Sequence, residues 1–223
     1  MTERLLLTCE HAGCVVPSNL RTPFHGKRKL LMSHRGWDPY AWEIARNVQK
    51  ILRVPLLVHR VSRLVVEVNR SPGHPKLFSE ITRALPEETK RRILKRWYHP
   101  HREAVTKAVR GMRGTVAHLG IHTFTPVLDG KVRRLDVGLL FDPGRAREAR
   151  FCNALRGCLE KASPGLRVRF NAPYKGTSDG LTTTLRKQFP AARYLGIEIE
   201  VNQAMRPADR RAFAKVLAGC LGA

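Results

Sequence analysis

Hydrophobic and polar residues alternate over several short stretches of the chain, a pattern that predicts β-strands. These stretches are residues 4–9, 55–69, 115–123, 137–141 and 194–202. Between them, apolar residues recur at helical spacing, which predicts helices over residues 38–52, 86–97, 144–162 and 207–221. Strands that alternate with helices favour one α/β domain over residues 1–223, with a mixed, mainly parallel sheet covered by helices on both faces.

Two of the predicted helices carry start or stop signals. Asp38 occupies a good N-cap position and Pro39 the first helical position. The helix that begins at Pro86 is expected to break or kink near Pro100. One face of the first helix then carries Trp42, Ala45, Val48 and Leu52.

Composition places the chain among globular proteins. Its 223 residues are 43% hydrophobic, enough to bury a substantial core. No apolar run approaches the ~20 residues that span a bilayer, and the apolar stretch near residue 5 is short for a signal peptide. We therefore expect a cytoplasmic protein without a membrane partner. The five cysteines form no CxxC pair, which favours reduced thiols over a disulfide framework or a cysteine-rich zinc site.

The charge is strongly positive: 41 Lys and Arg residues against 18 Asp and Glu give a net charge of +23. Such an excess raises the affinity for polyanions and attracts acidic ligands. The basic residues are spread along the whole chain, however, and form no basic tail or aromatic RNA-binding motif. A diffuse basic surface is therefore favoured over a dedicated nucleic-acid reader, with nucleic acid kept as an alternative partner.

Polar residues at strand ends are candidates for chemistry, because ligands of open α/β sheets gather beyond the carboxyl ends of the strands. Glu10 and His11 directly follow the first predicted strand, and His122 ends the third. His118 lies deeper in that strand and is expected to be structural. Asp38 is either a helix N-cap or a carboxylate that faces a site at the start of its helix.

Two further strands carry polar faces. Side-chain alternation puts Glu198, Glu200 and Asn202 on one face of the strand 194–202. Buried acids need a metal, an arginine or a proton, so a His11, Asp38 and His122 metal triad with a carboxylate base would explain them. The face that carries Arg63, Glu67 and Asn69 has two interpretations: Arg63 pairs with Glu67, or Arg63 or Arg70 binds a substrate carboxylate.

Eight motifs in one order resemble the N-formylglutamate amidohydrolase family, particularly its shorter branch. They cover nearly the whole chain, namely CEHAGCVVP (9–17), GWDPYAWEIA (36–45), SRLVVEVNRSP (62–72), YHPHR (98–102), HLGIHTFTPVLDG (118–130), DVGLLFDP (136–143), NAPYKG (171–176) and EIEVNQ (198–203). The resemblance implies a three-layer αβα, phosphorylase/hydrolase-like fold and cleavage of the N-acyl bond of an amino acid. The motif order is also similar to that of zinc-dependent N-acetylmuramoyl-L-alanine amidases.

By this resemblance His11, Asp38 and His122 would bind Zn²⁺ or another divalent metal, with Glu10 as a rival carboxylate ligand. Glu200 would be the catalytic base, with Glu198 as the alternative. The substrate would be a small acyl-amino acid such as N-formylglutamate. Two other functions stay open: a peptidoglycan-type amidase, and a basic polyanion-binding protein that kept the fold without the activity. The residues expected to bind substrate are Arg63, Asn69, Arg70, His101, Arg134, Asn171, Tyr174, Gly176 and Asn202.

Overall fold

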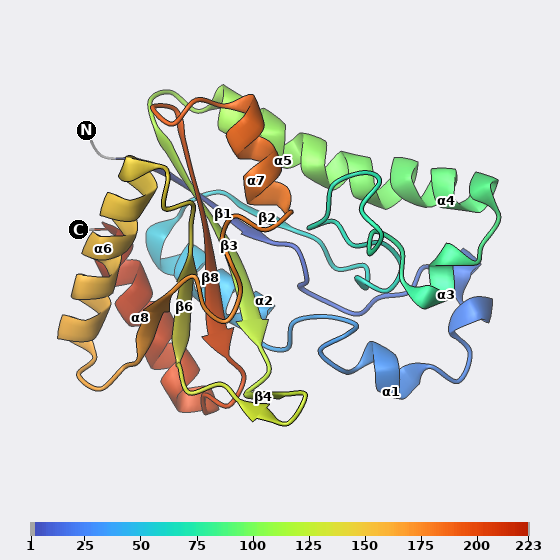
Figure 1. Cartoon of the computed structure of the whole chain (residues 1–223), viewed down its shortest axis with the longest axis horizontal. Helices are drawn as coiled ribbons and strands as arrows, with labels where there is room; N and C mark the ends of the chain where they lie inside the picture. The colour runs from blue at the N-terminus through green and yellow to red at the C-terminus, as the bar shows by residue number, and fades with distance from the viewer. Residues whose placement is uncertain (1–2, 223) are drawn as a thin grey trace.

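The computed structural model describes residues 3–222, and its centre is a six-stranded sheet in the order β2-β1-β3-β8-β6-β7 (Figure 1). Strands β2, β1, β3 and β8 run parallel, whereas β6 is antiparallel to β8 and parallel to β7. The strands are β1 (Arg4–Cys9), β2 (Leu56–Val58), β3 (Val116–Phe124), β6 (Val137–Leu140), β7 (Val168–Phe170) and β8 (Tyr194–Asn202).

Helices cover both faces of this sheet, so the molecule has three layers (Figure 1). Helices α2 (Ala41–Leu52), α6 (Ala146–Ala162) and α8 (Pro207–Gly222) pack on one face, where Ile44, Leu155 and Leu217 share a core with Leu119 and Ile197. Helices α5 (His99–Gly111) and α7 (Leu181–Gln188) pack on the other face. The mainly parallel, three-layer α/β architecture expected from the sequence is confirmed.

Shorter elements extend the molecule beyond the edge formed by β2. A second hydrophobic cluster there joins Leu20, Phe24 and Ile93 to the buried side chains of residues 64–68. No helix within residues 3–222 is both long and apolar enough to cross a membrane. The shorter elements are η1 (Ser18–Leu20), η2 (Thr22–Phe24), α1 (Arg28–Leu31), α3 (Glu80–Arg83), α4 (Glu87–Ile93), the π-helical turn η3 (Leu94–Tyr98), and the hairpin β4 (Val127–Leu128) and β5 (Lys131–Val132).

The strand predicted over residues 55–69 is wrong beyond Val58. After an isolated bridge between Val15 and Val61, the backbone turns and leaves the sheet. Val65 and Val66 are both fully buried although they are adjacent, which a half-buried strand does not allow. The second hydrophobic cluster surrounds this segment on several sides, so its apolar residues reflect an irregular core segment rather than a strand.

Helix α2 begins later than the sequence pattern predicts. Tyr40 precedes it with a left-handed backbone (φ 72°), and Asp38 does not cap the helix with its side chain. The buried face is also shifted: Ala41, Ile44, Ala45 and Val48 are buried, whereas Trp42 is only half-buried. The Asp38 carboxylate is therefore free to take part in other contacts.

The break expected near Pro100 is absent, because the chain stays helical from α4 through η3 into α5. Pro100 lies in the first turn of α5, where its missing N–H costs little. Helix α7 and strand β7 were missed by the sequence analysis. Both are short, and packing on the sheet determines them: β7 pairs with β6, and α7 contacts β8.

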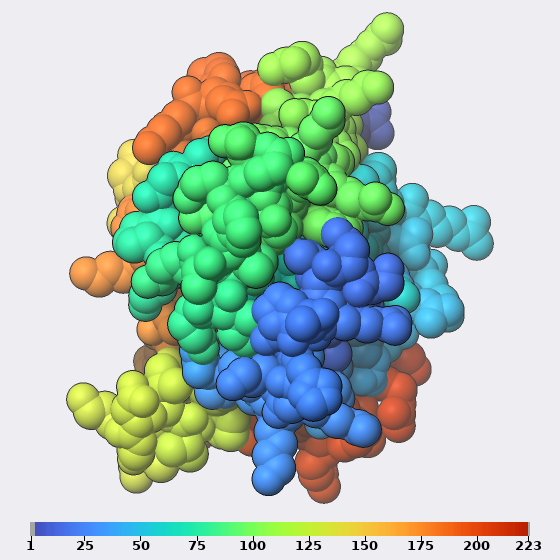
Figure 2. Space-filling model, turned by 90° about the vertical axis from the view of Figure 1, so that its right-hand side faces the viewer, coloured from blue at the N-terminus to red at the C-terminus, as the bar shows by residue number. Residues whose placement is uncertain are grey.

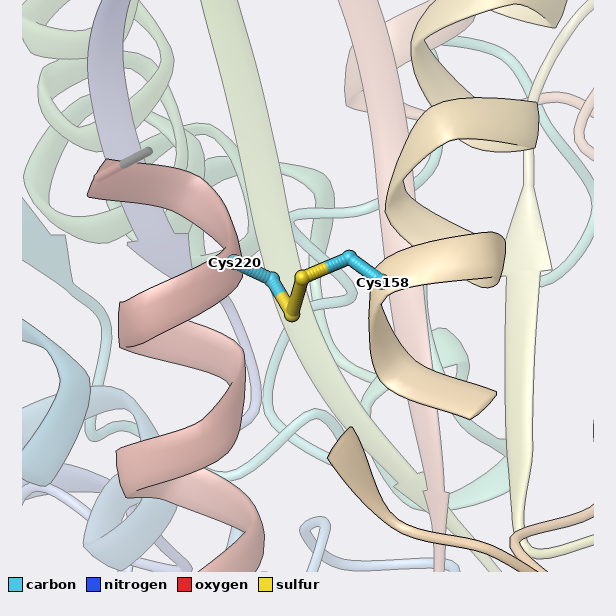
Figure 3. Close-up of a disulfide and its surroundings, with 2 residues drawn as sticks. All are labelled: Cys158 and Cys220. Atoms are coloured by element: carbon cyan, nitrogen blue, oxygen red, sulfur yellow. A yellow bond between two sulfur atoms is a disulfide. The ribbon is translucent and has the colours of Figure 1, made fainter. Parts of the chain in front are cut away.

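Two cysteines expected to be reduced form a disulfide. Cys158 of α6 and Cys220 of α8 are bonded across the gap between these neighbouring helices (Figure 3). The two cysteines are 62 positions apart in the chain, so no local sequence motif predicts that they pair. Cys9, Cys14 and Cys152 are free thiols, as expected.

Candidate active site

The carboxyl ends of β1, β3 and β8 meet at one edge of the sheet and bring the predicted site together. His11 follows β1 directly, and His122 lies opposite Glu200 in the register of β3 and β8. Because the three strands are parallel, residues at their ends share one edge. His122, Glu198 and Glu200 all project from the face that α5 and α7 cover, whereas Ile197 and its apolar partners project to the other.

Asp38 reaches the site through backbone contacts that hold its segment against the end of β1. The N–H of Asp38 donates to the carbonyl of His11 (3.0 Å). The preceding turn has no room for a side chain at Gly36, because a Cβ there would lie 2.0 Å from the Leu31 carbonyl oxygen. Oδ2 of Asp38 then lies 3.2 Å from Nδ1 of His11 and 3.1 Å from Nδ1 of His122. The carboxylate thus bridges the two imidazoles.

Each of the two imidazoles has a second carboxylate at its other ring nitrogen. Glu67 Oε1 is 2.5 Å from Nε2 of His11, and Glu10 Oε2 is 3.1 Å from Nε2 of His122. Gly120 leaves space beside the second contact, because a Cβ there would lie 3.3 Å from His122 Nε2, closer than an ordinary van der Waals contact. Carboxylates at the outer nitrogen orient metal-binding histidines and raise their basicity.

Arg63 links the carboxylates on one side of the site. Its guanidinium lies 2.6 Å from Glu67 Oε2 and 3.2 Å from Asp38 Oδ1. The pairing of Arg63 with Glu67 considered from the sequence is therefore present, although the segment is not a strand. Both carboxylates hold this guanidinium, which also lines the pocket with 28% of its side chain exposed.

These contacts set the charge of the site. Burial opposes ionisation of every group here, but the carboxylates of Asp38 and Glu10 still raise the pKa of His122 well above its usual value. Burial and Arg63 oppose the charged form of His11, yet Glu67 and Asp38 raise its pKa. The imidazoles and Arg63 in turn hold the pKa values of Asp38 and Glu67 below the usual range despite burial.

The residues present fit a divalent metal. His11, Asp38 and His122 are buried, and each offers one ligand atom within 4.8 Å of the other two. Two imidazoles and one carboxylate are the donor set of hydrolytic zinc sites, which keep a further position open. Glu10 lies on the other side of His122, at the nitrogen remote from Asp38, and its carboxylate oxygens have no hydrogen-bond partner among the described residues.

The two glutamates of β8 differ in their surroundings. Glu198 Oε1 accepts hydrogen bonds from Asn69 Nδ2 and Thr182 Oγ1, both at 3.3 Å. Glu200 is buried, and its Oε2 has no hydrogen-bond partner among the described residues. Burial, reinforced by the charges of Asp38 and Glu198, raises the pKa of Glu200 to about 8 even though His122 opposes the shift. Glu200 is thus the carboxylate suited to exchange a proton near neutral pH.

A pocket of about 210 Å³ opens onto the site and contains four of the predicted substrate contacts, Arg63, Asn69, Arg70 and Tyr174. Sequence reasoning missed four more residues that line it, because two of them lie in the motifs HLGIHTFTPVLDG and NAPYKG without having been assigned a role, and the other two lie on the loop after NAPYKG. They are Thr123, Lys175, Ser178 and Asp179.

The cations of this pocket are not equally available. Arg70 donates one N–H to the Asp179 carbonyl, and the Asp179 carboxylate accepts from Ser71. The side chain of Lys175 is exposed and makes no hydrogen bond or ion pair among the described residues, while its carbonyl accepts from the Ser178 N–H. Unlike Arg63, Lys175 and Arg70 pair with no carboxylate among the described residues, which leaves them the more available to a ligand.

The other five predicted substrate contacts lie outside this pocket. His101 is buried behind Glu10, 3.9 Å from its Oε1, and lines a different surface pocket. Arg134 is exposed elsewhere. Asn171, Gly176 and Asn202 contact the backbone instead. Asn171 accepts from the N–H groups of Phe141 and Gly176, and a Cβ on Gly176 would lie 2.1 Å from the Phe141 nitrogen. Asn202 donates to the Leu135 carbonyl.

Comparisons with known proteins identify the family and the fold of the chain. The family model of N-formylglutamate amidohydrolase matches residues 3–205. A crystal structure of an Agrobacterium tumefaciens gene product is similar to the chain at 28% identity and a TM-score of 0.83, covering 99% of this chain and 89% of the other. N-formylglutamate amidohydrolase from Ralstonia eutropha is similar at 20% identity and a TM-score of 0.70, covering 98% and 92%. No curated protein matches the chain.

Proposed function

The chain belongs to the N-formylglutamate amidohydrolase family, and on that premise we propose that it is a metal-dependent amidohydrolase that cleaves the N-acyl bond of an amino acid such as N-formylglutamate. One observation carries the proposal: His11, Asp38 and His122 converge beside the unpaired carboxyl oxygen of Glu200 at the floor of a pocket. The family supports amide hydrolysis, and the donor set supports the metal.

His11, Asp38 and His122 would hold a Zn²⁺ or similar ion. Bound there, the metal would supply a water of lowered pKa and polarise the scissile carbonyl. Glu200 accepts the proton of the attacking water at Oε2 and returns it to the amine nitrogen as the C–N bond breaks, which releases formate and the free amino acid. Glu67 and Glu10 keep the two imidazoles oriented through Nε2.

The pocket favours a substrate with negative charge. Arg70 and Lys175 line it and have N–H groups free to donate to a carboxylate of the amino acid. Asn69 already donates to Glu198 and accepts from the Leu181 N–H, so it supports the wall of the pocket. Tyr174, at the exposed rim, accepts from Arg133.

A direct test is release of free amine from a panel of N-formyl and N-acetyl amino acids by protein whose metal content has been measured. We expect hydrolysis of an N-formyl acidic amino acid that disappears after chelation and returns with added Zn²⁺. The variant His122→Ala should lose the metal as well as the activity, and His25→Ala, at an exposed histidine, serves as its matched control. Undiminished hydrolysis by metal-free protein would refute the metal-dependent mechanism, and no hydrolysis of any N-acyl amino acid by metal-loaded protein would refute the activity.

A further inference from the structure

A groove runs along the helical stretch α4–η3–α5, away from the active site. It consists of two adjoining surface pockets of about 690 Å³ and 310 Å³, which share Arg96 and Trp97. None of the residues that line them lines the active-site pocket. Figure 2 views this side of the molecule, where the helical stretch (green) lies beside the segment around residues 15–35 (blue).

The larger of the two pockets is lined by cations. Arg92, Lys95 and Arg96 line it, and no carboxylate does. Lys95 and Arg96 form no ion pair among the described residues, and Arg92 contacts only the exposed Glu88, a kind of pair that contributes little in water. From the segment 18–35, Asn19 and Leu20 line this pocket, and the segment contains five Lys or Arg residues and no Asp or Glu. A polyanion in the pocket would therefore meet the three cations of the helical stretch beside a segment that contains no acidic residue.

An aromatic side chain lies among these cations. Trp97 is half-buried, and the Arg96 guanidinium lies 5.6 Å from the centroid of its ring. Leu20 and Ile93 form the apolar floor beside it. Lys95, Arg96 and Trp97 all belong to the π-helical turn η3, a rare conformation that is often found at functional sites. The turn thus presents an indole and two cations next to one another.

We propose that this groove binds single-stranded nucleic acid. Proteins that bind single strands combine a positive groove for the phosphates with aromatic rings on which bases stack, and both parts are present here. An acidic peptide would pair with the cations but would gain no stacking on Trp97. The chain's net charge of +23 adds a general attraction for nucleic acid, and the groove is the site at which the strand would bind.

The test measures binding of a fluorescent oligodeoxythymidine of about 12 nucleotides by anisotropy, with the full chain, between about 50 and 200 mM salt. Trp97→Ala should weaken binding about 5- to 100-fold and leave the salt dependence unchanged, because it removes stacking alone. The triple variant Arg92→Ala, Lys95→Ala, Arg96→Ala should lower the slope of log affinity against log salt by about 2. Trp97→Phe keeps a ring in the apolar cluster and should retain most of the affinity.

The matched control removes three exposed cations from α6 and α8, Arg150→Ala, Arg211→Ala and Lys215→Ala, and should change the slope much less. All variants should keep wild-type hydrolysis of the best N-acyl amino acid, which separates this proposal from the enzymatic one. Equal losses in the two triple variants would overturn the proposal, as would unchanged binding by Trp97→Ala. Displacement of the oligonucleotide by a polyglutamate peptide or by anionic vesicles as readily as by unlabelled oligonucleotide would also overturn it.

Discussion

The candidate active site and the groove along α4–η3–α5 hold their charges in different ways in the same basic chain. The site gathers five of the 18 acidic residues around buried imidazoles, and Arg63 is held by two of them. The groove presents cations and no lining carboxylate, on the surface. Buried charges must be paired or bind a metal, whereas exposed cations are stabilised by water. The net charge of +23 therefore describes the surface and says nothing about the site.

The largest expected effect is a loss of turnover in the candidate active site when Glu200 is replaced. Replacing it with Gln removes the unpaired carboxylate but keeps its shape, so we expect turnover to fall about 10²- to 10⁴-fold while bound metal is retained. The measurements are steady-state kinetics and metal content. Glu198→Gln is the matched control, because that carboxylate is already held by Asn69 and Thr182. A greater loss in Glu198→Gln would reverse the assignment of the base.

His118, a buried histidine outside both regions, shows what burial does to an imidazole that pairs with no carboxylate within residues 3–222. His118 contacts only the hydroxyl groups of Thr8 and Tyr194, and burial lowers its pKa from 6.5 to about 4. As the pH falls from 6.5 towards 4, the unfolded chain binds a proton that the folded chain does not. We expect a progressive loss of up to about 3 kcal/mol in the free energy of unfolding over this range.

Urea unfolding at a series of pH values measures this loss. His118→Asn should be less stable at neutral pH, where the wild-type contacts are intact, but should lose less stability on acidification. If wild type and variant lose stability in parallel, His118 is not the group responsible.

Next in size is the effect of the carboxylates that orient the imidazoles. Glu67→Gln and Glu10→Gln should each raise the metal dissociation constant about 10- to 100-fold, measured by competition with a chelator. Glu160→Gln, on the surface of α6, should leave it unchanged. A far larger effect of Glu10→Gln than of Glu67→Gln would contradict the orienting role of Glu10 and identify it as a direct ligand.

The smallest effect concerns the exposed cation at the mouth of the pocket. Lys175→Ala should raise KM for an acidic substrate about 3- to 10-fold and change kcat little, because the ion pair it makes with the substrate stays partly solvated. Arg134→Ala, which removes an exposed cation outside the pocket, should leave KM unchanged. Equal changes in both variants would show that general surface charge, rather than Lys175, attracts the substrate.

Much of the fold and the core of the site could be predicted because local patterns determine them. Strand β8 begins and ends at the predicted residues, and its alternation places Glu198 and Glu200 on one face. His11 and His122 lie at the carboxyl ends of parallel strands, which must meet at one edge. Such positions follow from strand period and direction alone.

The rest depends on contacts between distant parts of the chain. Asp38 matches the pattern of a helix cap, and only the left-handed Tyr40 and the contact with the end of β1 turn it towards the histidines. Glu67 lies in an irregular segment, so strand alternation could not place it. Lys175 and Asp179 reach the pocket because Asn171 and Arg70 hold the loop around them, contacts that have no signature in the sequence.

The disulfide between Cys158 and Cys220 has a topological consequence for the site. It closes the chain into a covalent ring that contains β7, α7 and β8, and therefore both the pocket loop 171–180 and Glu200, the proposed base. A protease that cuts this loop once opens the ring but separates no fragment until the disulfide is reduced. The nicked molecule would migrate as one species without reductant and as two with it, with the base-bearing strand still tethered to the rest of the chain.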